Sequence, residues 1–287
     1  MTFYARSSGV PEEIAERDIV LTYVLKIMSG HILERLAFKG GTSLKKIFFG
    51  NTGRFSMDLD FTGIDIRPGE LSEGIRDLLH GRSWYGIDFE VPEENLTPES
   101  YLAVVRYAHA WNPGSVFEFQ VSFREVPVFP PDAVSLHSEM YFKFCEFRSF
   151  PVPCIRRDEV LSEKIRAAFQ RARSRDLYDL YLFAGRPYDR ETVKSLVVLK
   201  CWNARDPFDP ERFLDDVETG DYDWEDLKRL VRRGGLPLRE EVVGRVLDGY
   251  AFLADMDEVL LTIIEDSRAH RKKNLVDEVI ACLLDAI

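Results

Sequence analysis

The stretch Phe38–Phe61, FKGGTSLKKIFFGNTGRFSMDLDF, joins a glycine pair to two closely spaced aspartates. Residues 54–63, RFSMDLDFTG, predict a strand in which Asp58 and Asp60 share a face, because side chains two residues apart in a strand point the same way. Two like charges side by side on a half-buried strand repel each other and are costly to desolvate. A bound cation would remove this repulsion, so the stretch indicates a site for a metal and a charged ligand.

The glycine pair predicts a tight turn between a short strand and a new helix opened by Thr42 or Ser43. Backbone amides at such a turn form an anion site, and glycine allows a phosphate to approach the backbone closely. Mg²⁺ takes carboxylate oxygens together with substrate phosphate oxygens. The expected ligands are therefore Gly40, Gly41 and Thr42 or Ser43 for phosphate, and Asp58 and Asp60 for Mg²⁺ or Mn²⁺.

Ser56 and three lysines of the same stretch are further candidates. Ser56 shares the predicted face of Asp58 and Asp60, which would place its hydroxyl near the metal and make it a catalytic candidate; the alternative is an ordinary strand serine. The lysines flanking the glycines face either phosphate or solvent. They are Lys39, Lys45, for which solvent is favoured, and Lys46, a nucleotide-binding candidate.

The rest of the N-terminal half predicts helices alternating with strands. Helices are expected over 12–28, which Pro11 and two acids open, and over 68–82. Segment 101–111 is ambiguous, with its β-branched residues favouring a strand. Strands are predicted over 85–91, 101–111 and 115–125, and the turn signal Asn112–Gly114 would pair the last two antiparallel.

The proline-rich segment Val126–Pro131 is the predicted domain boundary, and helical patterns dominate from Asp158 onward. We therefore expect an α+β protein. Residues 1–130 would form a domain with a small mixed sheet flanked by helices. Residues 131–287 would form a mainly helical domain that contributes lysine, arginine and aspartate side chains to the cleft.

Composition narrows the class of protein. The chain has 287 residues and a formal net charge of −11, which opposes non-specific nucleic-acid binding but permits a local basic cleft. Its 4 scattered cysteines form no CxxC pair, which argues against a zinc knuckle and fits a reducing cytosol. The N-terminus resembles no signal peptide, and no apolar run approaches the ~18 residues that suggest a membrane span. We expect a cytoplasmic protein outside the membrane.

A second group of charges lies in EKIRAAFQRARSRDLYDLYLF, residues 163–183. As one helix, this segment would place Asp176 on an apolar side, which is unfavourable for a charge. Either the helix breaks near Ser174 and Asp176 caps a second helix, or Asp176 is a buried acid paired with an arginine; the SRD sequence favours the break. One continuous helix would align Lys164, Arg171, Arg175 and Asp179 in a stripe, which is ordinarily a solvated face.

Three blocks resemble a known family. KGGTSL, RFSMDLDF and SEKIRAAFQRARSRDLYDLY resemble, in order, blocks of the AbiEii/AbiGii-type nucleotidyltransferase toxins of the DNA polymerase β-like nucleotidyltransferase superfamily. The resemblance implies metal-dependent transfer of a nucleotide from an NTP to an acceptor hydroxyl, with release of pyrophosphate. It also implies a growth-inhibiting toxin with an antitoxin partner. For several such toxins the acceptor is the 3′ end of tRNA, which implies an RNA acceptor.

The resemblance implies roles for the charged residues of the third block: catalytic for Lys164 and Asp176, nucleotide-binding for Arg171, Arg175 and Asp179. The superfamily usually supplies a third acid from a later strand, but that position matches Gln120, which cannot act as a base. Glu118 shares the face of Gln120 and is the substitute metal ligand; the alternative is an exposed glutamate with no role.

Two other functions stay open. One is nucleotidyl transfer to a protein or a small molecule, although seven Lys/Arg against four Asp/Glu between residues 156 and 176 favour a polyanionic acceptor. The other is a non-catalytic module that binds a nucleotide or a partner protein, with Gln120 marking a lost acid.

Overall fold

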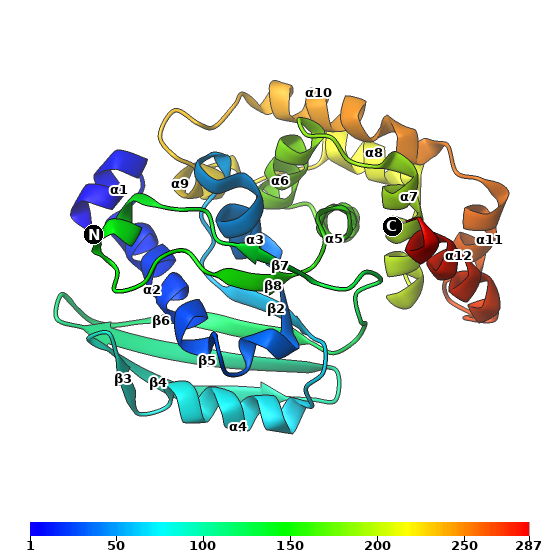
Figure 1. The fold of residues 1–287 in the computed structure, drawn as a ribbon. Coiled ribbons are helices and arrows are strands. Elements are labelled where there is room, and N and C mark those ends of the chain that lie inside the picture. The colour runs from blue at the N-terminus through cyan, green and yellow to red at the C-terminus, as the bar shows by residue number, and fades with distance from the viewer. Residues whose placement is uncertain (287) are drawn as a thin grey trace. The chain divides into compact units, whose positions relative to one another are not determined.

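The structure is a computed structural model that describes residues 1–286, and the chain forms two units (Figure 1). Unit 1 comprises Met1–Ile155 together with Arg229–Gly234, and unit 2 comprises Arg156–Lys228 and the chain from Gly235 onward. Within the described residues, unit 1 holds one mixed sheet and unit 2 is built from helices. The predicted α+β class is therefore confirmed.

The sheet of unit 1 has eight strands in the order β3-β4-β5-β6-β2-β1-β8-β7 within the described part of the chain. Two neighbouring pairs are parallel, β2 with β6 and β1 with β8, and the other pairs are antiparallel. The bounds are β1 Leu36–Lys39, β2 Leu59–Gly63, β3 Arg82–Trp84, β4 Ile87–Leu96, β5 Ser100–His109, β6 Asn112–Ser122, β7 Asp132–Ser135 and β8 Pro151–Cys154.

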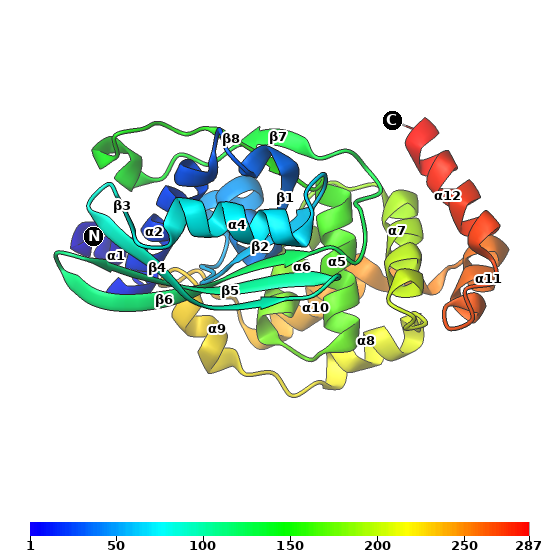
Figure 2. The same cartoon turned by 90° about the horizontal axis from the view of Figure 1, so that it is seen from below.

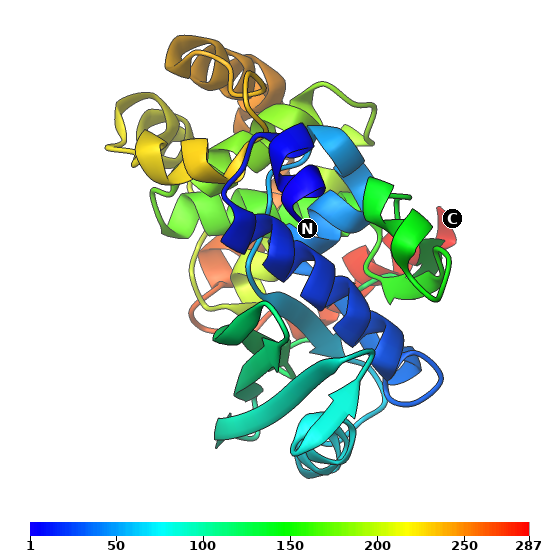
Figure 3. The ribbon, with the colours of Figure 1, turned by 90° about the vertical axis from the view of Figure 1, so that its left-hand side faces the viewer.

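Helices α2 and α4 cover one face of this sheet (Figure 3, with α2 in blue and α4 in cyan). Alternate residues of β5 and β6, such as Tyr107 and Phe119, are buried against them, as the period of two requires. The other face, called the second face below, carries Glu118 and Gln120. The helices of unit 1 are α1 Thr2–Ser8, α2 Glu12–Met28, α3 Gly40–Ser43, the π-helix Leu44–Phe49 and α4 Pro68–Leu79, with 3₁₀ turns at Leu33–Arg35, Gly50–Thr52 and Met140–Phe144.

The predicted helix over 12–28 is confirmed, and so is the antiparallel pair β5–β6. The predicted domain boundary at 126–131 differs from the structure. β7 and β8 extend the sheet beyond it, because Phe38 of β1 pairs with Cys154 of β8, so the first stretch of unit 1 ends at Ile155. The predicted turn at 112–114 is also displaced, since β6 already begins at Asn112.

Unit 2 is helical, and α5 packs against α6 and α7 within it. Figure 2 shows its helices from below, and none of the described helices has the length and apolarity to cross a bilayer. Aspartates open several of them, for example Asp189, whose carboxylate accepts a hydrogen bond from the Thr192 amide. The bounds are α5 Arg157–Gln170, α6 Ser174–Ala184, α7 Arg190–Asn203, α8 Pro210–Thr219, α9 Trp224–Leu230, α10 Arg239–Tyr250, 3₁₀ Ala251–Ala254, α11 Glu258–Asp266 and α12 Lys273–Asp285.

Candidate active site

Asp60 lies on the second face near the centre of the sheet. In the strand register its neighbours are Lys39 of β1 on one side and Gln120 of β6 on the other. Residues paired across a ladder point to the same face, so all three side chains share it. Leu59 and Phe61 point the opposite way and are fully buried, which explains how an apolar strand can present a carboxylate.

Asp58 lies just outside the ladder, because β2 begins at Leu59 and the predicted strand start at Arg54 is wrong. The reason is that Phe55 donates its amide to the Leu230 carbonyl (2.7 Å) instead of to a strand neighbour. Asp58 is nevertheless well held. Its carbonyl accepts from the Thr42 hydroxyl at 2.5 Å, and its Oδ1 accepts from the Glu118 amide at 3.2 Å.

The glycine pair packs directly against residues 56–60, which we call the acidic segment. Gly40 has φ +74°, and a Cβ added there would lie 2.2 Å from Oδ2 of Asp60. A Cβ on Gly41 would lie 2.8 Å from Oγ of Ser56 and 2.9 Å from Nη2 of Arg54. Only glycine can occupy these positions without displacing those groups. The structure thus brings together the predicted glycines, Ser56 and Asp60.

The helix begins at Gly40 itself, so the prediction that Thr42 or Ser43 opens it is wrong. Both hydroxyls donate to backbone carbonyls, Thr42 to Asp58 and Ser43 to Gly40 (2.9 Å). These bonds fasten the glycine turn to the acidic segment and to itself. Phosphate binding by this turn stays a prediction, and in this geometry it would use backbone amides rather than the two hydroxyls.

Glu118 and Gln120 share the second face, as their alternation predicts. Nε2 of Gln120 donates to Oε2 of Glu118 at 2.6 Å, while Glu118 remains exposed. Among the described residues no group of three or more His, Cys, Asp or Glu side chains is arranged to hold a metal. Asp58 and Asp60 alone still fit Mg²⁺, which is commonly bound by one or two carboxylates and completed by substrate phosphates.

Arg54 is a residue of this site that the sequence argument missed. It is 5% exposed, and its guanidinium approaches Gly41 while Nη1 donates to the Phe55 carbonyl at 3.3 Å. Its place two residues before Ser56 was visible in the motif. No local pattern, however, distinguishes an arginine that turns back under a glycine from one that faces solvent.

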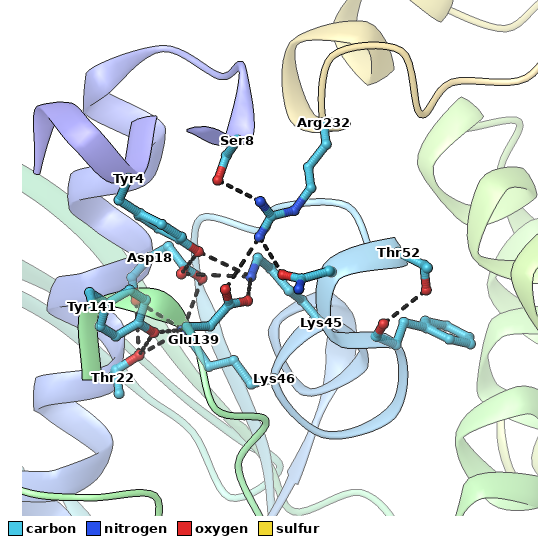
Figure 4. Close-up of polar contacts among 12 residues, drawn as sticks. Tyr4, Ser8, Asp18, Thr22, Lys45, Lys46, Thr52, Glu139, Tyr141 and Arg232 are labelled. Carbon is cyan, nitrogen blue, oxygen red and sulfur yellow. Dashed lines mark hydrogen bonds and ion pairs between the residues drawn. The ribbon is translucent and has the colours of Figure 1, made fainter. Parts of the chain in front are cut away.

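Lys45 and Lys46 point into the interior of unit 1 (Figure 4). Nζ of Lys46 donates to Oδ1 of Asp18 (2.8 Å) and to Oγ1 of Thr22 (2.8 Å). Nζ of Lys45 pairs with Glu139 at 2.6 Å, so the solvent position favoured for Lys45 is wrong. A nucleotide contact by Lys46 stays a prediction. We call this group the Lys46 cluster: Tyr4, Asp18, Thr22, Lys45, Lys46, Glu139 and Tyr141.

Electrostatics in the Lys46 cluster favour paired charges. Burial opposes ionisation of Asp18, but the ammonium groups of Lys45 and Lys46 outweigh it and lower the pKa of Asp18 to about 2. Burial lowers the pKa of Lys46, and Asp18 offsets part of this change. Burial also raises the pKa of Tyr4, whose hydroxyl donates to Asp18 at 2.9 Å, so the phenol stays neutral.

Unit 2 holds a second group of charges, only partly buried, the Lys164 cluster of Lys164, Arg171, Asp176 and Asp179. Nζ of Lys164 lies 2.8 Å from Asp179 and 3.2 Å from Asp176. Arg171 donates from Nε to Asp176 at 2.9 Å, and both aspartates are 1% exposed. The structure therefore assembles these predicted residues, and carboxylates hold the lysine in place from a second helix.

The two readings of Asp176 prove compatible. The helix does break, since α5 ends at Gln170 and α6 begins at Ser174. Asp176 does not cap α6; it is instead the buried acid paired with Arg171. Arg175 lies apart from the Lys164 cluster in its contacts, because its guanidinium makes two bonds to Asp226, at 2.6 and 2.8 Å.

Comparisons with known proteins show the family of the chain. The family described as "Nucleotidyl transferase AbiEii toxin, Type IV TA system" matches residues 27–245. The chain is also similar to the solved structure of MenT4, a nucleotidyltransferase toxin from Mycobacterium tuberculosis H37Rv. The two are 28% identical, with a TM-score of 0.84 and 98% of each chain covered. A comparison with curated proteins finds no match.

Proposed function

The chain belongs to the AbiEii family of nucleotidyl transferase toxins from type IV toxin–antitoxin systems, and we propose that its acceptor is RNA, with the 3′ end of tRNA as the specific target. The protein is a nucleotidyltransferase, which sets aside the non-catalytic binding module. An NTP substrate and an antitoxin partner follow from the family. The proposed reaction moves an NMP from the NTP to a ribose hydroxyl and releases pyrophosphate.

The observation that carries the proposal is the contact between the glycine turn and the acidic segment. Oδ2 of Asp60 occupies the space that a Gly40 side chain would fill. A phosphate bound by the amides of the turn would therefore lie beside a carboxylate that needs a cation. Such a pairing suits a metal-bound triphosphate, because the metal is shared between carboxylate and phosphate oxygens.

We assign the residues of unit 1 as follows. Gly40 and Gly41 hold phosphate, and Asp58 and Asp60 would hold Mg²⁺ or Mn²⁺. When bound, the metal neutralises phosphate charge and helps to orient the attacking and leaving oxygens. Glu118 is a further carboxylate on the second face, its amide donates to Asp58, and it is the candidate for the role that Gln120 cannot fill. Ser56 lies against Gly41, where its hydroxyl can donate to a phosphate.

In unit 2 we assign phosphate charge stabilisation to Lys164, which Asp176 and Asp179 orient. Arg171 is the candidate for contact with the nucleotide or the acceptor, because its side chain is 48% exposed. The basic excess between residues 156 and 176 supports a polyanionic acceptor such as RNA. An enzyme that modifies tRNA would act in the cytoplasm.

The test is incubation with total RNA and each α-labelled NTP in turn, followed by size separation. We expect Mg²⁺-dependent labelling of a tRNA-sized band. Asp58→Asn and Asp60→Asn should each reduce labelling on the order of 10³-fold or more, as loss of a residue essential to the chemistry does. Asp88→Asn, an exposed aspartate of β4, is the matched control and should label like wild type.

Two outcomes would contradict the proposal. If protein or small molecules were labelled and RNA were not, the acceptor would be one of those molecules and the proposed RNA acceptor would be wrong. Undiminished labelling by both Asp58→Asn and Asp60→Asn would remove the acidic segment from the reaction.

A further inference from the structure

A short segment from late in the sequence belongs to unit 1. Arg229–Gly234, which we call the strap, lies in unit 1 although the residues on either side of it belong to unit 2. Leu230 is buried in the apolar core of unit 1, and its carbonyl accepts the Phe55 amide at 2.7 Å. The amide of Arg233 donates to the Ser8 carbonyl at 3.2 Å.

Arg232 joins three other segments of unit 1 through one guanidinium (Figure 4). Nη1 donates to Oγ of Ser8 at 2.7 Å, and Nη2 donates to Oδ1 of Asn51 at 2.7 Å. Nη2 also lies 3.3 Å from Oε2 of Glu139. The planar fork of arginine suits this arrangement, because it fixes several donors in one orientation.

Glu139 connects Arg232 to the helix that follows the glycine turn, because its carboxylate contacts both Arg232 and Lys45. Its Oε1 accepts from Nζ of Lys45 at 2.6 Å, and Lys45 lies in the π-helix that continues from Gly40–Ser43. The Phe55 ring contacts both cations, with Nζ of Lys45 at 4.5 Å and Cζ of Arg232 at 5.6 Å from its centroid. Phe55 is fully buried, which strengthens cation–π attraction.

Phe55 is a critical point for the acidic segment. Residues 54–57 form no strand pair, so the sheet does not fix them. Their bonds include the one from the Phe55 amide to the Leu230 carbonyl and the one from Arg54 to the Phe55 carbonyl. Ser56 follows directly, so its position depends on how firmly the strap holds Phe55. Asp58 follows next and is held in addition by the Thr42 hydroxyl and the Glu118 amide.

We propose that Arg232 is a positioning residue for nucleotidyl transfer. Through Glu139 and Lys45 it fixes the helix after the glycine turn, and through Phe55 it fixes the approach to Asp58. It touches no substrate itself. The inference rests on the proposed function of this site. A displacement of about 1 Å at a reacting group can reduce a rate on the order of 10²-fold, so a remote anchor of this kind affects turnover.

The test compares Arg232→Ala, Asn51→Ala and the control Arg229→Gln. Asn51 is exposed and supplies one acceptor to Arg232. Arg229 lies in the strap, like Arg232, but makes an exposed ion pair with Glu13 of α2. The measurements are kcat, the KM for NTP, the Mg²⁺ concentration for half-maximal rate, and hydrogen exchange of the Phe55 amide. All are made on full-length protein at a temperature where each variant is folded.

We expect Arg232→Ala to lower kcat on the order of 10–100-fold, to raise the Mg²⁺ requirement and to speed exchange at Phe55. Asn51→Ala should give a smaller loss of the same kind, and Arg229→Gln should match wild type. A lowered unfolding midpoint with wild-type kcat and Mg²⁺ requirement would overturn the proposal. If Arg232→Ala does not fold, Asn51→Ala decides, and wild-type values in that variant would overturn it.

Calorimetric binding of each Mg²⁺–NTP separates this inference from the proposed function. Wild-type protein that binds an NTP but labels no RNA would refute the RNA acceptor alone. Under that outcome, weaker NTP binding by Arg232→Ala supports the positioning role and equal binding overturns it.

Discussion

The Lys46 cluster of unit 1 and the Lys164 cluster of unit 2 both pair lysine with aspartate but differ in exposure. In the first, Lys45 and Lys46 are enclosed by Asp18, Glu139 and two tyrosines, and every one of these side chains is buried. In the second, Lys164 is held by two buried aspartates, but the Arg171 side chain is 48% exposed.

The difference in exposure suits different roles for the two clusters, support of the fold for the Lys46 cluster and contact with a ligand for the Lys164 cluster. A buried pair that satisfies its own charges stabilises one arrangement and must break its own bonds before it can meet a ligand. A pair with a half-exposed arginine at its edge can exchange a carboxylate for a phosphate, because the guanidinium fork matches either. We therefore interpret the Lys46 cluster as support for the fold of unit 1, and the exposed arginine of the Lys164 cluster agrees with the ligand contact proposed for it.

The largest change in the free energy of unfolding should come from a substitution in the Lys46 cluster. Lys46→Met would leave Asp18 buried without its nearest ammonium, and loss of one partner of a buried pair costs about 3–5 kcal/mol. Urea unfolding measures this change, with the exposed Lys143→Met as control. A loss below about 1 kcal/mol would mean that the cluster does not support the fold, and the comparison would fail.

Acid should weaken the same cluster next. The pKa of Asp18 falls from its usual 3.8 to about 2 on folding, so its contribution is complete above pH 3.8 and is lost as the pH falls towards 2. The difference of nearly two pKa units corresponds to about 2 kcal/mol. Stability against pH, compared between wild type and Asp18→Asn, should show a shallower acid slope in the variant. Equal slopes would place the acid sensitivity elsewhere.

A smaller change in the free energy of unfolding is expected for a substitution in the Lys164 cluster. Arg171→Gln removes a half-exposed partner of Asp176, while Lys164 remains beside that carboxylate. The free energy of unfolding should fall by about 1 kcal/mol, whereas the KM for NTP or RNA should rise several-fold. An unchanged KM for both substrates would show that this exposed arginine meets neither, and the two clusters would then be alike.

The smallest effect is expected for Arg175→Gln. Its two bonds to Asp226 join side chains that are each 37% exposed, and exposed pairs contribute about 0–1 kcal/mol. The midpoint of thermal unfolding should therefore change little. The KM for NTP should rise only if Arg175 leaves Asp226 to bind nucleotide. A large rise in KM would move Arg175 into the same class as Arg171.

The sequence predicted those features that depend on local pattern. Helix α2 follows from its apolar spacing, and the break near Ser174 was predicted from the SRD sequence, although Asp176 does not cap the second helix. The Lys46 cluster could not be predicted in this way. Lys45 and Lys46 lie in a π-helix, where the 3.6-residue period does not apply, and their acids lie far away along the chain at Asp18 and Glu139.

The domain boundary and the strap were missed for a related reason. The prolines of residues 126–131 resemble a linker, yet β8 pairs with β1, more than a hundred residues earlier, and β7 pairs with β8. The contact of Phe55 with Leu230 likewise joins distant parts of the sequence. Periodicity and turn signals report neighbours along the chain, so they cannot report such pairings.

The strap also determines what happens when the chain is cut. A protease that cleaves between Ile155 and Arg156 would separate the two units in sequence, but Arg229–Gly234 would still lie in unit 1. The buried Leu230 and the bonds of Arg232 would hold the C-terminal fragment to the N-terminal one. The nicked protein should therefore elute as one complex, because the N-terminal fragment alone lacks the strap that completes unit 1.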